Sequence, residues 1–112
     1  MGTLPPDLFR SWVHSFEEDA GDVTVYRPAE YPFPPARGRG GMEFGPDGVF
    51  VNHPVGRGDA PEAVPCRWRL LAERRLAVRC PRSVGGDWER ELEIVHCGDD
   101  VLRVRWTHPG QR

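Results

Sequence analysis

A histidine and an acidic run near the N-terminus carry the residue types best suited to proton transfer. An imidazole titrates near neutral pH, so a histidine on the inner face of a domain can move a proton or anchor a ligand. His14 and Glu17, the latter in the run Glu17-Glu18-Asp19, are therefore the candidate catalytic residues. His96 is the second histidine that we expect on an inner face. For both histidines, the alternative is a neutral core side chain with one hydrogen-bond partner.

Arginines of a glycine-rich segment form the second group with chemical potential. Arg37 and Arg39 lie in Arg-Gly-Arg-Gly-Gly, and Arg27 precedes a proline-rich stretch. A guanidinium matches a carboxylate in a two-pronged pair. These arginines predict either an anion site or a structural pair with the acids of 17–19 that holds the loop across one end of the fold. The segment lacks the Gly-Lys-Ser/Thr ending of a phosphate loop.

Three cysteines, Cys66, Cys80 and Cys97, show no paired metal-knuckle spacing, so we predict no metal and no cofactor. Cys66 and Cys80 fall opposite each other in the strand register described below. We expect two buried free thiols there, with oxidation of this cross-strand pair to a disulfide as the alternative, because an odd cysteine count fits a reducing compartment.

The elements that must position these residues are short strands. Apolar residues recur with a period of two between turn signals, and only Pro5-Pro6-Asp7-Leu8-Phe9-Arg10 favours a short helical turn. The predicted strands are 11–18, 22–27, 41–45, 49–53, 65–71, 75–80, 87–96 and 101–107. Long loops are expected over 28–40 and 54–64.

Turn chemistry sets the register of these strands. Gly45-Pro46-Asp47-Gly48 favours a type I turn with a left-handed Gly48, which pairs Phe44 with Phe50 and Met42 with Asn52. The same argument for the next two hairpins predicts the pairs Trp68 with Val78, Cys66 with Cys80, Ile94 with Val104, Leu92 with Trp106, Glu93 with Arg105, and Val95 with Arg103.

One face of the sheet is then apolar and the other charged. The predicted inner face holds Trp12, His14, Phe16, Met42, Phe44, Phe50, Cys66, Trp68, Leu70, Leu76, Val78, Cys80, Trp88, Leu92, Ile94, His96, Leu102, Val104 and Trp106. With almost no helix available, the sheet must cover itself. We predict a single all-β domain over 1–112, a small eight-stranded antiparallel up-and-down barrel, with a β-sandwich as the alternative. Its aromatic rings predict either a packed lumen or an open-ended ligand cleft.

The N-terminal segment resembles a known family. Leu8-x-Arg10-x-Trp12 is similar to the Leu-x-Gly-x-Trp start of lipocalins and other calycins, with Arg10 in place of the glycine. The resemblance implies a barrel whose tryptophan closes one end, with Arg103 or Arg105 packed over it. The segments 12–19, 25–28 and 34–39 also resemble small bacterial lipocalin-like proteins of uncharacterised function. This implies a fold and ligand binding, not a reaction.

Three functions follow as hypotheses. The first is a binding protein for an apolar or aromatic small molecule or a peptide. The candidate ligand-binding residues are Trp12, His14, Arg37, Arg39, Trp68 and His96. The second is a cofactor-independent cyclase or isomerase that uses His14 or Glu17. The third is an interaction or accessory module, with a homodimer as one form, to which the odd cysteine and outward Val13, Leu71 and Val95 would contribute.

The overall composition indicates which classes of binding partner are disfavoured. All 15 basic residues are arginine, and 17 acids leave a net charge of -2, which disfavours a general nucleic-acid binder. The chain has no apolar run long enough to span a membrane and no secretory signal at its start, so a cytoplasmic location and no membrane partner are expected.

Overall fold

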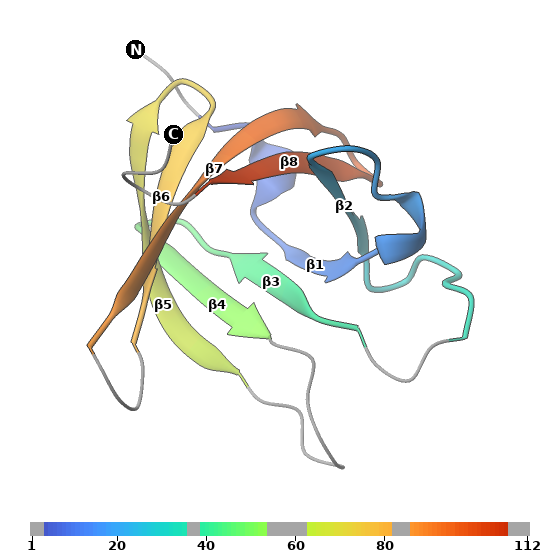
Figure 1. Cartoon of the computed structure of the whole chain (residues 1–112), viewed down its shortest axis with the longest axis horizontal. Coiled ribbons are helices and arrows are strands. Elements are labelled where there is room, and N and C mark those ends of the chain that lie inside the picture. The colour runs from blue at the N-terminus through green and yellow to red at the C-terminus, as the bar shows by residue number, and fades with distance from the viewer. Residues whose placement is uncertain (1–3, 36–38, 54–62, 82–85, 108–112) are drawn as a thin grey trace.

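The computed structural model describes residues 4–35, 39–53, 63–81 and 86–107, and these ranges contain eight strands and two 3-10 turns (Figure 1). The turns are η1 (Pro6–Leu8) and η2 (Phe16–Glu18). The strands are β1 (Ser11–His14), β2 (Val23–Pro28), β3 (Gly41–Phe44), β4 (Val49–His53), β5 (Val64–Ala72), β6 (Arg75–Cys80), β7 (Trp88–Cys97) and β8 (Leu102–Thr107). The predicted strands and the N-terminal turn are confirmed, apart from the details given below.

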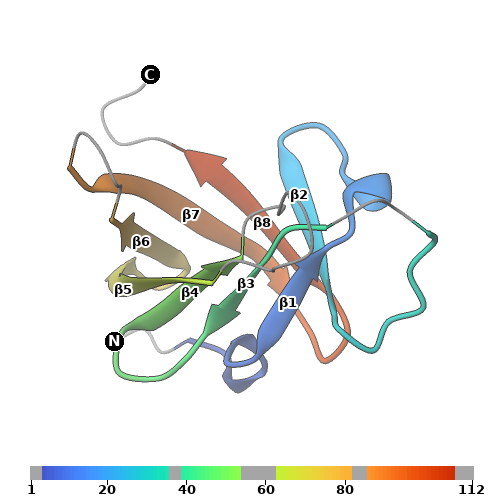
Figure 2. The same cartoon turned by 90° about the horizontal axis from the view of Figure 1, so that it is seen from below.

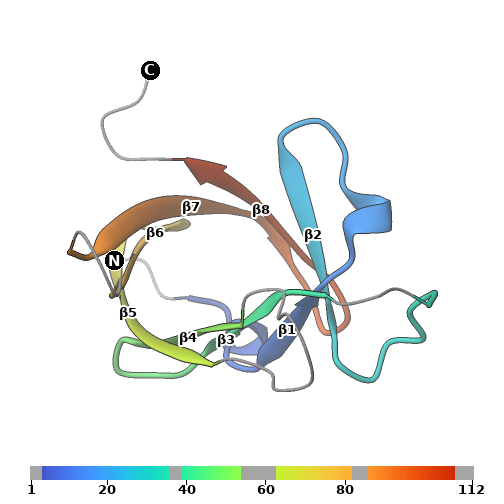
Figure 3. The same cartoon turned by 60° about the horizontal axis from the view of Figure 1, so that its bottom comes forward.

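The strands close into a barrel in which every strand runs antiparallel to both of its neighbours. Figure 3 shows the ring, with β7 and β8 facing β3, β4 and β5 across the interior. The predicted eight-stranded antiparallel barrel is therefore confirmed. Closure leaves no sheet edge unpaired, which is how an all-β domain with no helical layer covers its apolar face.

One connection departs from simple succession around the ring. β1 lies between β2 and β3, and β2 pairs with β8, while β3 to β8 follow one another in sequence order. β2 and β3 both run antiparallel to β1, so they are parallel to each other and the segment 29–40 that joins them cannot be a tight hairpin. Figure 2 shows this link beside β1 and β2. Its proline- and glycine-rich length permits a crossing that a tight hairpin could not make.

The hairpin register agrees with the turn argument. Phe44 pairs with Phe50, Met42 with Asn52, and Trp68 with Val78. The turn before β4 differs from a simple type I turn, because Asp47 has a φ of 64° and Gly48 a φ of 84°. An aspartate tolerates this left-handed conformation better than most residues, so the turn has two left-handed positions instead of one.

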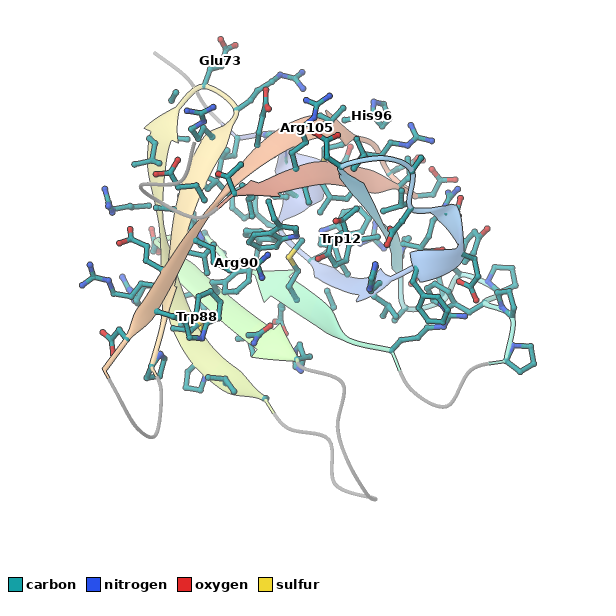
Figure 4. The ribbon with its side chains drawn as sticks, in the orientation of Figure 1. Trp12, Glu73, Trp88, Arg90, His96 and Arg105 are labelled. Carbon is teal, nitrogen blue, oxygen red and sulfur yellow. A yellow bond between two sulfur atoms is a disulfide. The ribbon has the colours of Figure 1, made fainter. Side chains whose placement is uncertain are left out.

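A β-bulge changes the register near the end of β7. The pairs Leu92 with Trp106, Glu93 with Arg105 and Ile94 with Val104 are confirmed. The predicted pair Val95 with Arg103 is wrong, because an irregularity between Ile94 and His96 places His96 opposite Arg103. An extra residue reverses the alternation of faces that follows it. His96 is consequently exposed on the outside of the barrel, not on the inner face (Figure 4).

Two other predicted inner residues are more exposed than core positions, although Leu70 does pair with buried Leu76 as the inner face requires. β1 ends at His14, and the 3-10 turn η2 that follows leaves Phe16 43% exposed. The side chain of Ser15 donates to Glu18 at 2.7 Å within this turn, a local bond that competes with strand continuation. Leu70 is 40% exposed where β5 reaches the irregular end of its hairpin.

The cysteine prediction is wrong. Cys66 of β5 and Cys80 of β6 form a disulfide, with their Cα atoms 4.5 Å apart, and Cys97 is the free cysteine. The separation is that of a directly opposed antiparallel pair without backbone hydrogen bonds between its residues. The predicted opposition of these cysteines was right, but opposition at that distance permits the bond that we did not expect.

The 3-10 turn η1 closes one end of the barrel. Leu8 is fully buried, and Trp12 is 1% exposed and donates its indole N–H to the Leu8 carbonyl at 3.0 Å. The Arg10 guanidinium lies 5.4 Å from the Trp12 ring centre. The arginine expected over this ring was Arg103 or Arg105; instead, both project from the outer face, and Arg105 binds Asp22 and Glu93.

Candidate functional site

The sequence-predicted ligand residues do not meet at one place. Trp12 belongs to the closed end, and His96 lies outside the barrel. Trp68 is partly buried, and its indole N–H donates at 2.8 Å to the carbonyl of Gly45, in the turn that joins β3 and β4. Arg37 lies outside the described residues. Both tryptophans thus have their single polar atom bound within the fold.

His14 lies at the rim where β1 ends. Its Nε2 is 2.8 Å from an Asp19 carboxylate oxygen, and its ring is 5.4 Å from the ring of Tyr26. The other carboxylate oxygen of Asp19 accepts the backbone N–H of Val25 at 2.8 Å. Asp19 therefore fixes the imidazole against the start of β2, and the histidine is oriented rather than free.

The arginines of the long loop are bound to acids. Arg39 forms a two-pronged pair with Glu17, at 2.8 and 2.5 Å, and its guanidinium lies between the rings of Phe16 and Phe33. The hydrogen bonds from Arg39 hold the pKa of Glu17 below its ordinary value. Both oxygens of the Glu17 carboxylate are engaged, so it is poorly placed to act as a base. This is the predicted structural pair that fastens the loop to the start of the chain.

A second pair of the same kind joins η2 to β2. Arg27 donates to both carboxylate oxygens of Glu18, at 2.9 and 2.7 Å, and lies over the Tyr31 ring. The bonds from Arg27, with a further one from Ser15, lower the pKa of Glu18 to about 2. The two pairs together brace the rim with charges that are already satisfied.

The Glu18 pair makes stability depend on acidity. The pKa of Glu18 in the folded protein lies below the usual 4.5. The contribution of the Glu18–Arg27 pair to the free energy of unfolding is therefore present above pH 4.5 and is lost as the pH falls towards 2. We expect wild type to lose about 1 kcal/mol more unfolding free energy over this interval than Glu18→Gln, a figure reduced for solvent screening. Urea unfolding at pH 5 and pH 2.5 measures it. The exposed-carboxylate variant Glu30→Gln should behave as wild type, and equal acid sensitivity in Glu18→Gln would contradict the prediction.

The inner face differs between the two halves of the barrel. Towards the closed end it is a packed core, in which Leu76, Leu92 and Val104 are at most 1% exposed. At the other end, where β6 and β8 end and β7 begins, Trp88, Arg90 and Trp106 on this same face are only partly buried. The packed lumen that we considered is thus present in one half, and the opposite half presents aromatic and polar groups.

Arg90 is the unexpected member of the inner face. It pairs with buried Val78 and lies two residues from Leu92 on β7, so its side chain projects into the barrel (Figure 4). Its guanidinium lies 4.6 Å from the Trp106 ring centre, and the Trp106 indole N–H donates to the Tyr26 hydroxyl at 3.1 Å. We call Tyr26, Trp88, Arg90 and Trp106 the Arg90 cluster.

The Arg90 cluster offers donors without acceptors. The Nε atom of Arg90 is buried with no hydrogen-bond partner, and no carboxylate of the described residues pairs with this guanidinium. The Tyr26 hydroxyl accepts from Trp106, which leaves its own proton to donate. Burial raises the pKa of Tyr26, so this proton is held at neutral pH. Buried donors of this kind are costly unless an acceptor satisfies them.

The signal for Arg90 was present in the sequence. Trp88 and Leu92 were both assigned inward, and strand alternation requires that Arg90 between them share their face. The inner face was defined from apolar positions alone, so Arg90, a charged residue on that face, was not included. Tyr26 was missed because 22–27 had no turn-defined partner, since β2 pairs with β8 at the far end of the sequence.

No protein-family model, curated protein or solved structure matches this chain. In the described part of the chain, none of the helical segments has the length and apolar character needed to cross a bilayer. Within the same residues, no set of three or more histidine, cysteine, aspartate or glutamate side chains is arranged to hold a metal ion.

Proposed function

We propose that this protein is a small barrel that binds an aromatic or apolar molecule bearing an anionic oxygen group, such as a carboxylate. The buried Nε atom of Arg90 on the inner face, which has no hydrogen-bond partner among the described residues, carries the proposal. The first of the three hypotheses from sequence is retained, with a different set of residues: the Arg90 cluster replaces Trp12, Trp68 and His96.

Two features of the cluster support this class of ligand. Trp88 and Trp106 provide rigid apolar area at the accessible half of the barrel, which suits a ring or an alkyl group. Arg90 and the Tyr26 hydroxyl provide donors that a carboxylate would accept, and a hydrogen bond to a charged group contributes about 1.5–3 kcal/mol. A short peptide that presents its terminal carboxylate has the same chemistry.

The alternative of a cyclase or isomerase gains less support from the geometry. Its proposed acid, Glu17, has both carboxylate oxygens bound to Arg39. The His14 ring lies against Tyr26 of the Arg90 cluster, but its Nε2 is engaged by Asp19 at the rim. Binding requires only the groups that the cluster already presents.

A matched pair of fluorescent probes tests the role of Arg90. One probe is 1-anilinonaphthalene-8-sulfonate, and the other is N-phenyl-1-naphthylamine, which has the same rings without the sulfonate. We expect Arg90→Met to weaken sulfonate-probe binding by about 10- to 100-fold, the loss of one charged hydrogen-bonding partner, and to change neutral-probe binding little. Tyr26→Phe should weaken the sulfonate probe by a smaller factor.

The control for this experiment is Arg103→Met, which removes the same charge from the exposed outer face of β8. It should bind both probes as wild type does. Near-ultraviolet circular dichroism confirms that each variant keeps its tertiary packing. The proposal fails if wild type binds neither probe in a saturable way, or if Arg90→Met weakens both probes equally.

A further inference from the structure

A pocket of about 330 Å³ lies on the outside of the barrel, lined by Arg67, Trp68, Arg69, Ala77, Arg79 and Glu89. We call it the outer pocket. Its residues come from β5, β6 and the start of β7, strands that lie side by side in Figure 1. Ala77 faces outward but is only 2% exposed, since the neighbouring side chains cover it. The volume falls in the range of small-molecule sites.

The charges of the outer pocket are unbalanced. Glu89 is its single carboxylate and accepts from Arg69 at 2.9 Å and from Arg79 at 3.4 Å. These contacts lower the pKa of Glu89, with the larger effect from Arg69. Arg67 has no carboxylate partner among the described residues and donates instead to the Asp47 carbonyl at 3.2 Å. Three guanidinium groups therefore line the outer pocket with one carboxylate, which two of them contact.

The strand register adds an unfavourable feature. Arg67 and Arg79 are directly opposite each other on β5 and β6. Like charges at directly opposed positions destabilise a sheet. Between β6 and β7 the opposed charges are unlike, because Arg79 is opposite Glu89 and Arg75 is opposite Glu93, so the like-charge pair is confined to the β5–β6 side. A pair of arginines that lowers stability and also lines a pocket is a feature of sites that hold an anion.

We propose that the outer pocket binds a small phosphate monoester. Three arginines less one glutamate leave two positive charges, and a monoester carries close to two negative charges at neutral pH. Its oxygens match the two-pronged donor geometry of arginine. The site is separate from the Arg90 cluster, which lies on the opposite face of the same wall. The proposal therefore stands or falls independently of the lumen ligand.

The test is titration calorimetry with glycerol 2-phosphate, which lacks the ring that the Arg90 cluster would bind, with inorganic phosphate as a second probe and chloride at matched ionic strength as the blank. We expect one saturable site per chain. Arg67→Gln and Arg79→Gln should each weaken binding at least tenfold. Glycerate, which presents one negative charge on a similar small hydroxylated chain, should bind at least tenfold more weakly than glycerol 2-phosphate.

Two variants serve as controls. Arg75→Gln removes a charge from the same strand as Arg79, outside the outer pocket, and should leave binding within twofold of wild type. Arg90→Met should also leave it unchanged. Absence of saturable binding by wild type overturns the proposal, as does binding that survives in Arg67→Gln and Arg79→Gln. A loss in Arg90→Met alone would assign the phosphate to the lumen and overturn it as well.

Stability gives a second readout on the same variants. Because Arg67→Gln removes a repulsion and only one hydrogen bond to a carbonyl, its melting temperature without phosphate should equal or exceed that of wild type. Weaker phosphate binding in a variant at least as stable as wild type cannot come from unfolding. A drop in melting temperature would show that Arg67 is structural and would contradict the inference.

Discussion

Replacing Trp12 with alanine is expected to lower the free energy of unfolding by about 3–5 kcal/mol. The side chain is 1% exposed, packs in the main core cluster, and binds the carbonyl of Leu8 through its indole N–H. The substitution removes buried apolar area, leaves a cavity beneath η1, and removes one of the two hydrogen bonds that the Leu8 carbonyl accepts, the other coming from the Arg10 backbone N–H. Urea unfolding at neutral pH, followed by circular dichroism, measures the loss.

Trp88→Ala is the matched control, because Trp88 is on the same inner face but only partly buried. Its loss should be smaller, on the order of 1–2 kcal/mol. Trp12→Phe keeps a ring but not the donor, so it should fall between wild type and Trp12→Ala. Equal losses for Trp12→Ala and Trp88→Ala would show that Trp12 has no special role at the closed end.

Removal of the Cys66–Cys80 disulfide is expected to lower the unfolding free energy by about 3 kcal/mol, because it releases a loop of about 15 residues in the unfolded chain. The cysteines are 14 positions apart, and both are buried in the barrel wall. The comparison is Cys66→Ala with Cys80→Ala against wild type, by urea unfolding without reductant. Cys97→Ala, which leaves the disulfide intact, should remain close to wild type.

Thiol titration provides the direct check. Burial raises the pKa of the Cys97 thiol to about 11, so its reactivity in the folded protein should be low. In denaturant without reductant, one thiol should react, and three should react after reduction. Three reactive thiols in unreduced, denatured protein would show that the disulfide does not form.

The parts of the fold that followed from sequence are those with local causes. The turn at Gly45–Gly48 and the alternation along the hairpins correctly placed Phe44, Phe50, Trp68 and Val78. No turn residue marks the bulge that moves His96 outward. The end of β1 depends on the Asp19 carboxylate, which accepts from the Val25 backbone N–H, and on the hydrogen bond from Ser15 to Glu18. Such features depend on contacts formed only in the folded barrel.

The site was harder to predict than the fold for a related reason. His14, Arg39 and Glu17 were chosen for their residue types, and the structure shows that each is engaged by a neighbour. Whether a polar side chain is free to bind a ligand depends on the partners around it in the folded protein. The residue type alone does not show these partners. Arg90 has the reverse character: it was assigned to neither face from sequence, and its position opposite Val78 places a charged residue on an otherwise apolar face.

The disulfide also changes an argument about the surroundings of the protein. We expected a reducing compartment partly because the cysteine count is odd. With Cys66 and Cys80 joined and Cys97 left over, the count no longer supports that expectation, because disulfides persist mainly in oxidising compartments. An odd number of cysteines is compatible both with three free thiols and with one disulfide plus one free thiol, so the number alone does not distinguish them.

In the ring, β1 lies beside β3 and β2 lies beside β8, and this strand order has a consequence for biosynthesis. β2 pairs with β8, so Val23 must meet Arg105 before the ring can close. β8 is the last of the eight strands to leave the ribosome, and contacts so distant in sequence form slowly. Until then, β2 and β7 each present an unpaired edge, a known template for association between chains. The nascent chain therefore depends on its final strand for protection from aggregation.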